Sequence, residues 1–409
     1  MVRLGLFLSL GIFLLPTPAQ ACGGCFHQVG PITSQTSTVV TGHRMAFAVS
    51  ETQTVLWDQF SYEGEAAEFS WVLPVQPDAY LELSDDAWLE ALDSSTQMNV
   101  VSPTLECAQP KFSSGSGCGC GSSDSATSAS GNVDPNGSGG FAGKGGVTII
   151  RHETVGPYET DVVQSQDPNA LHDWLVNNGY VIPDEIQPII DAYVSEGMDF
   201  LALKLRPGFG VQQMEPVRVI TPGGAYLLPL RMVAAGIGSF VEVKLFVIAG
   251  ARYAMPDLAE VRVNPKDVVY DFATSSSNYL TARNAALAQN SGKSYVVTSA
   301  QIENGGLCGG FSCGDQNDLE AALLGMNPSG VWLTRLELNL PATALDHDCI
   351  VEPALSQTPV SATITAGQYK NPPCDEALFS ADVGGTGFGV WALLTFCARW
   401  LVRRREARA

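Results

Sequence analysis

The sequence predicts an α+β fold, a predominantly antiparallel β-sheet with a few packed helices, followed by a single C-terminal transmembrane segment. Short runs rich in β-branched residues recur along the chain, and Gly and Pro fill the gaps between them, as at 207–208 and 221–224. Fewer segments show helical spacing, and the chain closes on an apolar stretch followed by arginines. Strands with interspersed helices of this kind are typical of α+β proteins.

The chain before residue 113 favours strands. Residues 36–49 are rich in β-branched side chains. The runs 54–60 and 68–73 flank Glu63-Gly64-Glu65, which predicts a hairpin between them.

One helix is expected in the same part of the chain. Residues 85–92 have helical spacing, which places Trp88, Leu89 and Leu92 on one face. Ser84 is the expected N-cap of this helix.

The chain after residue 146 predicts both element types. Strands are expected at 147–150, 200–205, 217–220, 226–232, 241–248, 259–263, 295–298 and 331–340. Helices are expected at 167–178, 184–194, 278–289 and 318–324. The five strands between 200 and 263 are expected to form one antiparallel run.

The first 21 residues predict a secretory signal peptide. A positive Arg3 precedes an apolar stretch at 4–15, and Ala21 places a small side chain at the expected cleavage site. The apolar stretch is too short to span a bilayer permanently. Cleavage after Ala21 leaves Cys22 first, and lipidation of Cys22 is the alternative, although Gln20 fits a lipoprotein signal poorly.

The last residues, 384–409, predict a membrane anchor or sorting signal. Gly384 and Gly385 precede an apolar stretch at 388–398, and a cluster of arginines follows it. Such a cluster stays on the cytoplasmic side of a membrane. The expected partners of this tail are therefore the membrane and a sorting protease, and residues 352–383 are expected to be a disordered stalk.

The cysteines predict disulfide bonds, because an exported protein meets an oxidising compartment. Of the ten cysteines, Cys397 lies in the tail. The other nine are the disulfide candidates Cys22, Cys25, Cys107, Cys118, Cys120, Cys308, Cys313, Cys349 and Cys374. The expected local bridge joins Cys308 to Cys313, whose short Gly-rich spacing lets them approach. An odd number leaves one cysteine free, paired between chains, or lipidated at Cys22.

Structural zinc is the alternative reading of the cysteines. Cys22-x-x-Cys25 and Cys118-x-Cys120 are close pairs, and His347 lies near a cysteine. A zinc site of this kind has a second, regularly spaced pair, which the sequence lacks. No metal site and no cofactor is therefore predicted.

A Gly/Ser-rich stretch divides the expected ectodomain. Residues 113–146 cannot bury enough apolar surface to offset the entropy of ordering, which predicts a flexible loop. It separates an N-terminal part, 22–112, from a main α+β part, 147–351. Limited proteolysis is expected to cut first in this loop.

The charge of the expected ectodomain disfavours nucleic acid as a partner. Residues 22–385 carry 16 Lys and Arg against 41 Asp and Glu, a net charge of about −25. Phosphate binding needs a clustered basic surface. We interpret the charge as a source of solubility rather than as a site for a specific cationic substrate.

One short motif resembles the sequence around a nucleophilic serine. Gly310-Phe311-Ser312-Cys313-Gly314 matches the G-x-S-x-G elbow of α/β-hydrolases, which needs a strand directly before the serine and a helix directly after it. Here the expected strand ends near 298 and the helix begins near 318. The compact partner set is 346–348, Asp-His-Asp, whose adjacent residues cannot easily supply both acid and base. These three could also contribute to a calcium site, but without EF-hand spacing.

Four segments carry a family resemblance. They are Ala-Cys-Gly-Gly-Cys-Phe at 21–26, Phe-Ser-Trp-Val-Leu-Pro-Val at 69–75, Tyr-Leu-Leu-Pro-Leu-Arg at 226–231 and Val-Trp-Leu-Thr-Arg-Leu at 331–336. In this order they resemble the uncharacterised bacterial domain-of-unknown-function family 2330, over most of residues 22–350. The resemblance implies export and brings no catalytic residue.

The tail separately resembles a Gly-Gly sorting signal processed by a rhomboid-type protease, and departs from it in its short apolar core and in Arg399. Together these patterns predict an exported, anchored protein of the cell envelope with a structural or binding role. The alternative is an envelope serine hydrolase that uses Ser312.

Overall fold

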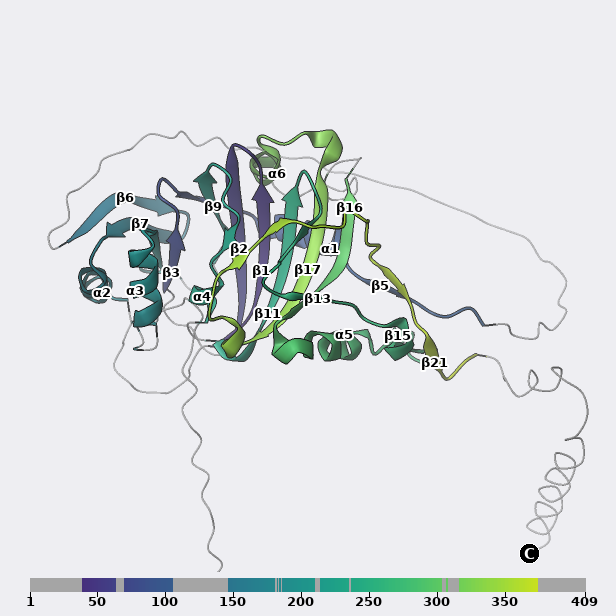
Figure 1. The fold of residues 1–409 in the computed structure, drawn as a ribbon. Coiled ribbons are helices and arrows are strands. Elements are labelled where there is room, and N and C mark those ends of the chain that lie inside the picture. Colours follow the sequence, from purple (N-terminus) through teal and green to yellow (C-terminus); the bar gives the residue numbers. More distant parts are fainter. Residues whose placement is uncertain are drawn as a thin grey trace, which may run out of the picture.

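The computed structural model describes residues 39–63, 70–105 and 146–373, apart from 181, 183, 185, 210–213, 235–236, 304–306 and 308–315. Two β-sheets pack against each other, and helices cover the outer face of each sheet (Figure 1). The expected α+β class is confirmed.

The larger sheet has eight strands in the order β13-β16-β17-β11-β1-β2-β9-β4. Their bounds are β1 Val39–Val49, β2 Gln53–Glu63, β4 Tyr80–Leu83, β9 Val217–Pro222, β11 Ile237–Ala249, β13 Ala259–Val261, β16 Ser294–Ile302 and β17 Trp332–Pro341. The sheet is mixed, because β1 pairs with β11 in parallel and β13 with β16 in parallel, whereas the other neighbours are antiparallel.

The smaller sheet is antiparallel throughout, in the order β3-β8-β7-β6. Its strands are β3 Ser70–Val75, β6 Val147–Val155, β7 Tyr158–Ser165 and β8 Asp199–Leu205. Short strands pair at the margins: β5 Asn99–Val101 with β20 Thr363–Thr365, β10 Leu227–Leu228 with β18 Cys349–Ile350, β12 Tyr253–Ala254 with β19 Glu352–Pro353, and β14 Val269–Asp271 with both β15 Ser276–Ser277 and β21 Gln368–Lys370.

Six α-helices lie in the described part of the chain. They are α1 Asp86–Thr96, α2 Pro168–Asn177, α3 Gln187–Ser195, α4 Leu230–Val233, α5 Tyr279–Leu287 and α6 Gln316–Leu323. The apolar face expected for α1 is confirmed, because Trp88, Leu89 and Leu92 are fully buried. Its N-cap is Asp85 rather than Ser84: Asp85 accepts a hydrogen bond from the Ala87 amide at 2.7 Å.

The alternation of side chains along the strands explains the layers. On β1, Met45 and Phe47 face the core between the two sheets, whereas Ala46 and Ala48 face α1 and α6. A strand that is apolar on both faces belongs in the centre of a sheet, which is where β1 and β11 lie. The small side chains at 46 and 48 leave room for Trp88 and its neighbours.

Two predicted pairings are wrong. The runs 54–60 and 68–73 form no hairpin, because β2 pairs with β1 and β9 whereas β3 joins β8 in the other sheet. The strands between 200 and 263 do not form one antiparallel run: β8 and β9 belong to different sheets, and β11 lies between β1 and β17. Turn residues locate the end of a strand, but not its partner.

The strand predicted at 226–232 is shorter than expected. It is the two-residue strand β10, followed by Pro229 and α4.

The chain on both sides of residues 113–146 forms one folded unit. β1, β2 and β4 share a sheet with β9 and β11, and β3 pairs with β8. The prediction of a disordered stalk is wrong for its described part. Residues 352–370 contain β19, β20 and β21, and each of these strands pairs with an earlier strand.

Several predicted features lie outside the described residues: the signal peptide at 1–21, all but the last residue of the loop at 113–146, and the tail at 384–409. Within the part of the chain that the structure describes, none of the helices has the length and apolar character needed to cross a membrane.

Candidate metal centre

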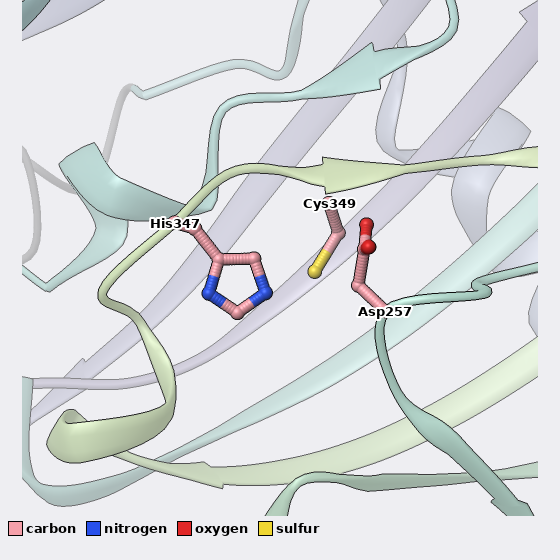
Figure 2. Close-up of side chains that lie close together, drawn as sticks. All are labelled: Asp257, His347 and Cys349. Carbon is pink, nitrogen blue, oxygen red and sulfur yellow. The ribbon is translucent and has the colours of Figure 1, made fainter.

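Three side chains with metal-binding atoms meet at one edge of the core. Asp257, His347 and Cys349 each place one donor atom within 4.8 Å of the other two (Figure 2). The aspartate comes from the connection between β12 and β13, and the other two come from the segment that ends in β18. A carboxylate, an imidazole and a thiol thus converge from two distant parts of the sequence.

A tight turn places Asp257. The Leu258 amide donates a hydrogen bond to the Met255 carbonyl at 3.1 Å, which closes a turn that contains Pro256. Met255 is fully buried and Leu258 nearly so, so that apolar packing fixes the turn from both sides. The Asp257 carboxylate is exposed, and it accepts a hydrogen bond from the Ile350 amide at 3.0 Å.

Two features of the backbone place His347 and Cys349. His347 lies in the bend that precedes β18, and Cys349 is the first residue of β18, held by the pairing of β18 with β10. Asp348, between them, makes other contacts: its carboxylate accepts hydrogen bonds from the Tyr193 hydroxyl at 2.6 Å and from the Arg231 guanidinium at 2.7 Å. The ion pair with Arg231 therefore fixes the backbone on which the two donors lie.

The imidazole of His347 is oriented by its neighbour. Nδ1 lies 2.7 Å from Oδ1 of Asp346, which in turn lies 3.3 Å from the ammonium group of Lys293. An ionised carboxylate can only accept, so Nδ1 carries a proton, and in the neutral imidazole Nε2 is then the nitrogen with the lone pair. Figure 2 shows one ring nitrogen of His347 turned toward the Cys349 sulfur and Asp257. A carboxylate that orients a histidine in this way is the usual outer partner of a metal-binding imidazole.

The side chains that surround the Cys349 thiol are mostly acidic. Burial, together with the nearby carboxylates of Asp257, Asp348 and Asp346, raises the pKa of the Cys349 thiol to about 12. Hydrogen bonds from His347 and Lys293 hold the pKa of Asp346 below its usual value. Nucleophilic cysteines lie instead in electropositive, accessible surroundings. These surroundings disfavour a reactive thiol, and a cation bound beside Cys349 would be needed to favour its thiolate form.

The donor set indicates the class of metal. Sulfur, imidazole nitrogen and carboxylate oxygen together suit Zn²⁺, whereas Mg²⁺ and Ca²⁺ prefer oxygen ligands alone. A zinc site with three protein ligands keeps a fourth position for water or another ligand. The side chain of His347 is 40% exposed, which gives solvent access to that position.

Of the predicted disulfide candidates, Cys349 alone belongs to the described residues, and it is a buried free thiol there. The other eight candidates, Ser312 of the hydrolase motif, Ala21 of the cleavage site, and Gly384 and Gly385 of the tail all lie outside the described residues. The disulfide pairings remain predictions.

Regular ligand spacing does not reveal this cluster. The signal in the sequence is the run Asp-His-Asp-Cys at 346–349, which brings a potential imidazole ligand and a potential thiolate ligand two positions apart. Nothing in the sequence marks Asp257, 90 positions before His347, as the third member.

Comparison with known proteins gives a family and no characterised relative. No curated protein and no solved structure matches the chain. Residues 16–304 match the family described as "Uncharacterized protein conserved in bacteria (DUF2330)". That match covers well over half of the 409 residues. The chain therefore belongs to the DUF2330 family of bacterial proteins.

Proposed function

We propose that this protein is an exported component of the bacterial cell envelope whose ectodomain binds a zinc-class divalent ion through Asp257, His347 and Cys349. The observation that carries the metal-binding role is the convergence of their three donor atoms within 4.8 Å. The acidic surroundings and the orientation of His347 by Asp346 support the same role.

The export part of the proposal rests on the sequence. A signal peptide at 1–21 would carry the chain to the envelope, and the tail at 384–409 would anchor it there. Nine cysteines precede the tail segment, an odd number, so that full pairing among them leaves one over. We assign that place to Cys349, because its complete burial shields the thiol from oxidants.

The role at this centre is binding rather than nucleophilic catalysis. With three ligands from the protein, the bound metal would keep one position toward solvent, beside the half-exposed His347. That position could take a carboxylate, an imidazole or a thiolate from a partner. The ion would also join the Pro256 turn to β18, two segments that the Asp257–Ile350 hydrogen bond already connects.

The test is a comparison of metal stoichiometry between two histidine variants of the full ectodomain. The chain, dialysed against Zn²⁺ and then against buffer, is examined by native mass spectrometry. His347→Ala should bind one zinc fewer than the unchanged protein. The control His172→Ala lies on α2, where the imidazole is 37% exposed beside Asp173, and it should bind the same number as the unchanged protein. Equal zinc content in the two variants would refute the proposed centre, whatever other sites the chain contains.

A further inference from the structure

A second candidate site lies between the two sheets and shares no residue with the metal centre. A cavity of about 160 Å³ is bordered by β2, β3, β7, β8 and residues 214–217. The residues that line it include the aromatic Phe60, Trp71 and Tyr158 and the acidic Asp58, Asp86 and Glu215. An engineered protein cavity of roughly 150 Å³ holds one benzene molecule. The space therefore fits one compact organic group.

The aromatic part of the lining is held in place by its neighbours. Trp71 and Tyr158 are almost fully buried, and the rings of Phe60 and Trp71 lie 5.9 Å apart between centroids at 55°. The Tyr158 hydroxyl donates a hydrogen bond to the Glu215 carbonyl at 2.7 Å and accepts one from the Glu215 amide at 3.0 Å. These contacts fix the rings before any ligand binds.

The charged part of the lining is entirely negative. Among the described residues that border the cavity there are three carboxylates and no Lys, Arg or His. Asp58 is paired with the imidazole of His43, 3.0 Å away. Asp86 accepts a hydrogen bond from the Gln59 amide, and within the described part of the chain neither Asp86 nor Glu215 forms an ion pair. Two carboxylates at the rim are thus available to a cation.

We propose that this cavity binds a small organic ammonium ion of the size of a quaternary ammonium group. The faces of aromatic rings attract such cations, and several rings around one charge are the known arrangement for quaternary ammonium recognition. Asp86 and Glu215 supply the opposing charge. An inorganic divalent ion would gain little from a lining with three aromatic residues, because it prefers a full set of oxygen ligands.

The ion is free rather than part of a phospholipid. In a choline phospholipid the phosphate lies next to the ammonium group, which would bring it close to Asp86 and Glu215. Like charges at such short distances repel, and the repulsion is stronger near a protein interior than in water. The proposal is independent of the zinc centre, and either can fail without the other.

Calorimetric titration of the ectodomain with choline, and with its uncharged isostere 3,3-dimethylbutan-1-ol, tests the proposal. The two molecules have nearly the same shape, so a cavity selected for charge should bind choline at least about tenfold more tightly. Equal affinities, or no saturable choline binding, would overturn it.

Matched variants locate the binding. The double variant Asp86→Asn, Glu215→Gln should weaken choline binding by at least about tenfold, because it removes both rim charges. Glu320→Gln, an exposed acid on α6 that does not line the cavity, is the control and should bind as the unchanged protein does. If the double variant and the control lose choline affinity equally, the loss reflects the overall negative charge of the protein, and the proposed site is overturned. Binding to phosphatidylcholine vesicles without binding to free choline would overturn the assignment to a free ion.

Discussion

The Asp257 carboxylate accepts a hydrogen bond from the Ile350 amide at 3.0 Å, and this contact joins the Pro256 turn to the strand that carries Cys349. It fixes one carboxylate oxygen and leaves the other for a metal ion. Asp257 thus has a structural role and a proposed ligand role, and substitution can separate the two.

The first prediction concerns this separation. Asp257→Asn keeps an oxygen that can accept the Ile350 hydrogen bond but removes the charge. It should fold with unchanged stability and lose zinc affinity by at least the roughly tenfold that even an outer partner of a metal site contributes. Competition with a zinc-binding dye measures the affinity, and urea unfolding in the presence of a chelator measures the stability. Unchanged zinc affinity would remove Asp257 from the ligand set.

The second prediction concerns the buried Asp318 on α6. Its carboxylate accepts hydrogen bonds from the Trp57 indole at 2.7 Å, from the Ser84 hydroxyl at 2.9 Å and from the Arg218 guanidinium at 2.7 Å. Asp318→Ala leaves a largely buried guanidinium without its better-buried partner, and should cost roughly 3–5 kcal/mol of unfolding free energy. Urea denaturation measures this cost.

The control for this change lies on the same helix. Glu320 is exposed, and Glu320→Ala should change the unfolding free energy by no more than about 0.5 kcal/mol. Similar losses in the two variants would mean that the helix, and not the Asp318 network, determines the effect.

The third prediction concerns stability at high pH. Burial is the main cause that raises the pKa values of Tyr253 and Tyr279 to about 12, against about 10 for an unfolded tyrosine. A raised folded pKa contributes stability that is complete below the unfolded value and is lost as the pH rises through the folded value. The unfolding free energy should therefore fall between about pH 10 and about pH 12.

Phenylalanine variants separate this loss from general alkaline effects. Tyr279→Phe keeps the buried ring without an ionisable hydroxyl, so its fall in stability should be smaller by up to roughly 2–3 kcal/mol. The exposed Tyr226→Phe should fall as the unchanged protein does. The measurement is urea unfolding at a series of pH values, and superimposable curves for all three proteins would exclude Tyr279 as a contributor.

The fourth prediction concerns location in the cell. Removal of residues 386–409 should release the protein in soluble form into the periplasm or the medium, because the proposed anchor is then absent. Fractionation followed by immunoblotting measures the distribution. Membrane association that survives the truncation would place the anchor elsewhere, and lipidation of Cys22 would become the leading explanation. The paired glycines of the tail should matter for processing by the expected sorting protease. Glycine weakens a helix by about 1 kcal/mol relative to alanine, and a protease needs a locally unwound helix to reach the peptide bond. Replacing Gly384 and Gly385 with leucine should therefore leave a full-length, membrane-bound chain.

Local elements could be predicted from the sequence, because they depend on neighbouring residues. The apolar face of α1 and the start of α2 at Asp167-Pro168 follow from spacing and capping chemistry, and both are present. The order of strands could not be predicted, because β1 and β11 pair in parallel across almost 200 residues. No turn signal records a pairing between segments so far apart.

The candidate site shows the same limit. The sequence shows His347 and Cys349 as potential ligands, yet their convergence with Asp257 depends on the packing of the Pro256 turn against β18. The composition of residues 352–370 suggests a disordered stalk, whereas their strands pair with β12, β5 and β14. Backbone hydrogen bonds of this kind leave almost no signature in composition.

The most direct test of the zinc-class centre is the absorption spectrum of the ectodomain loaded with Co²⁺ in place of Zn²⁺. A cobalt ion bound by Cys349 should show an intense thiolate-to-metal charge-transfer band in the near ultraviolet, together with visible bands of a four-coordinate site. The difference between the unchanged protein and Cys349→Ser is the decisive quantity, because it assigns the band to this one sulfur. The account predicts that this single substitution removes one equivalent of the charge-transfer intensity. An identical spectrum in the two proteins would contradict it.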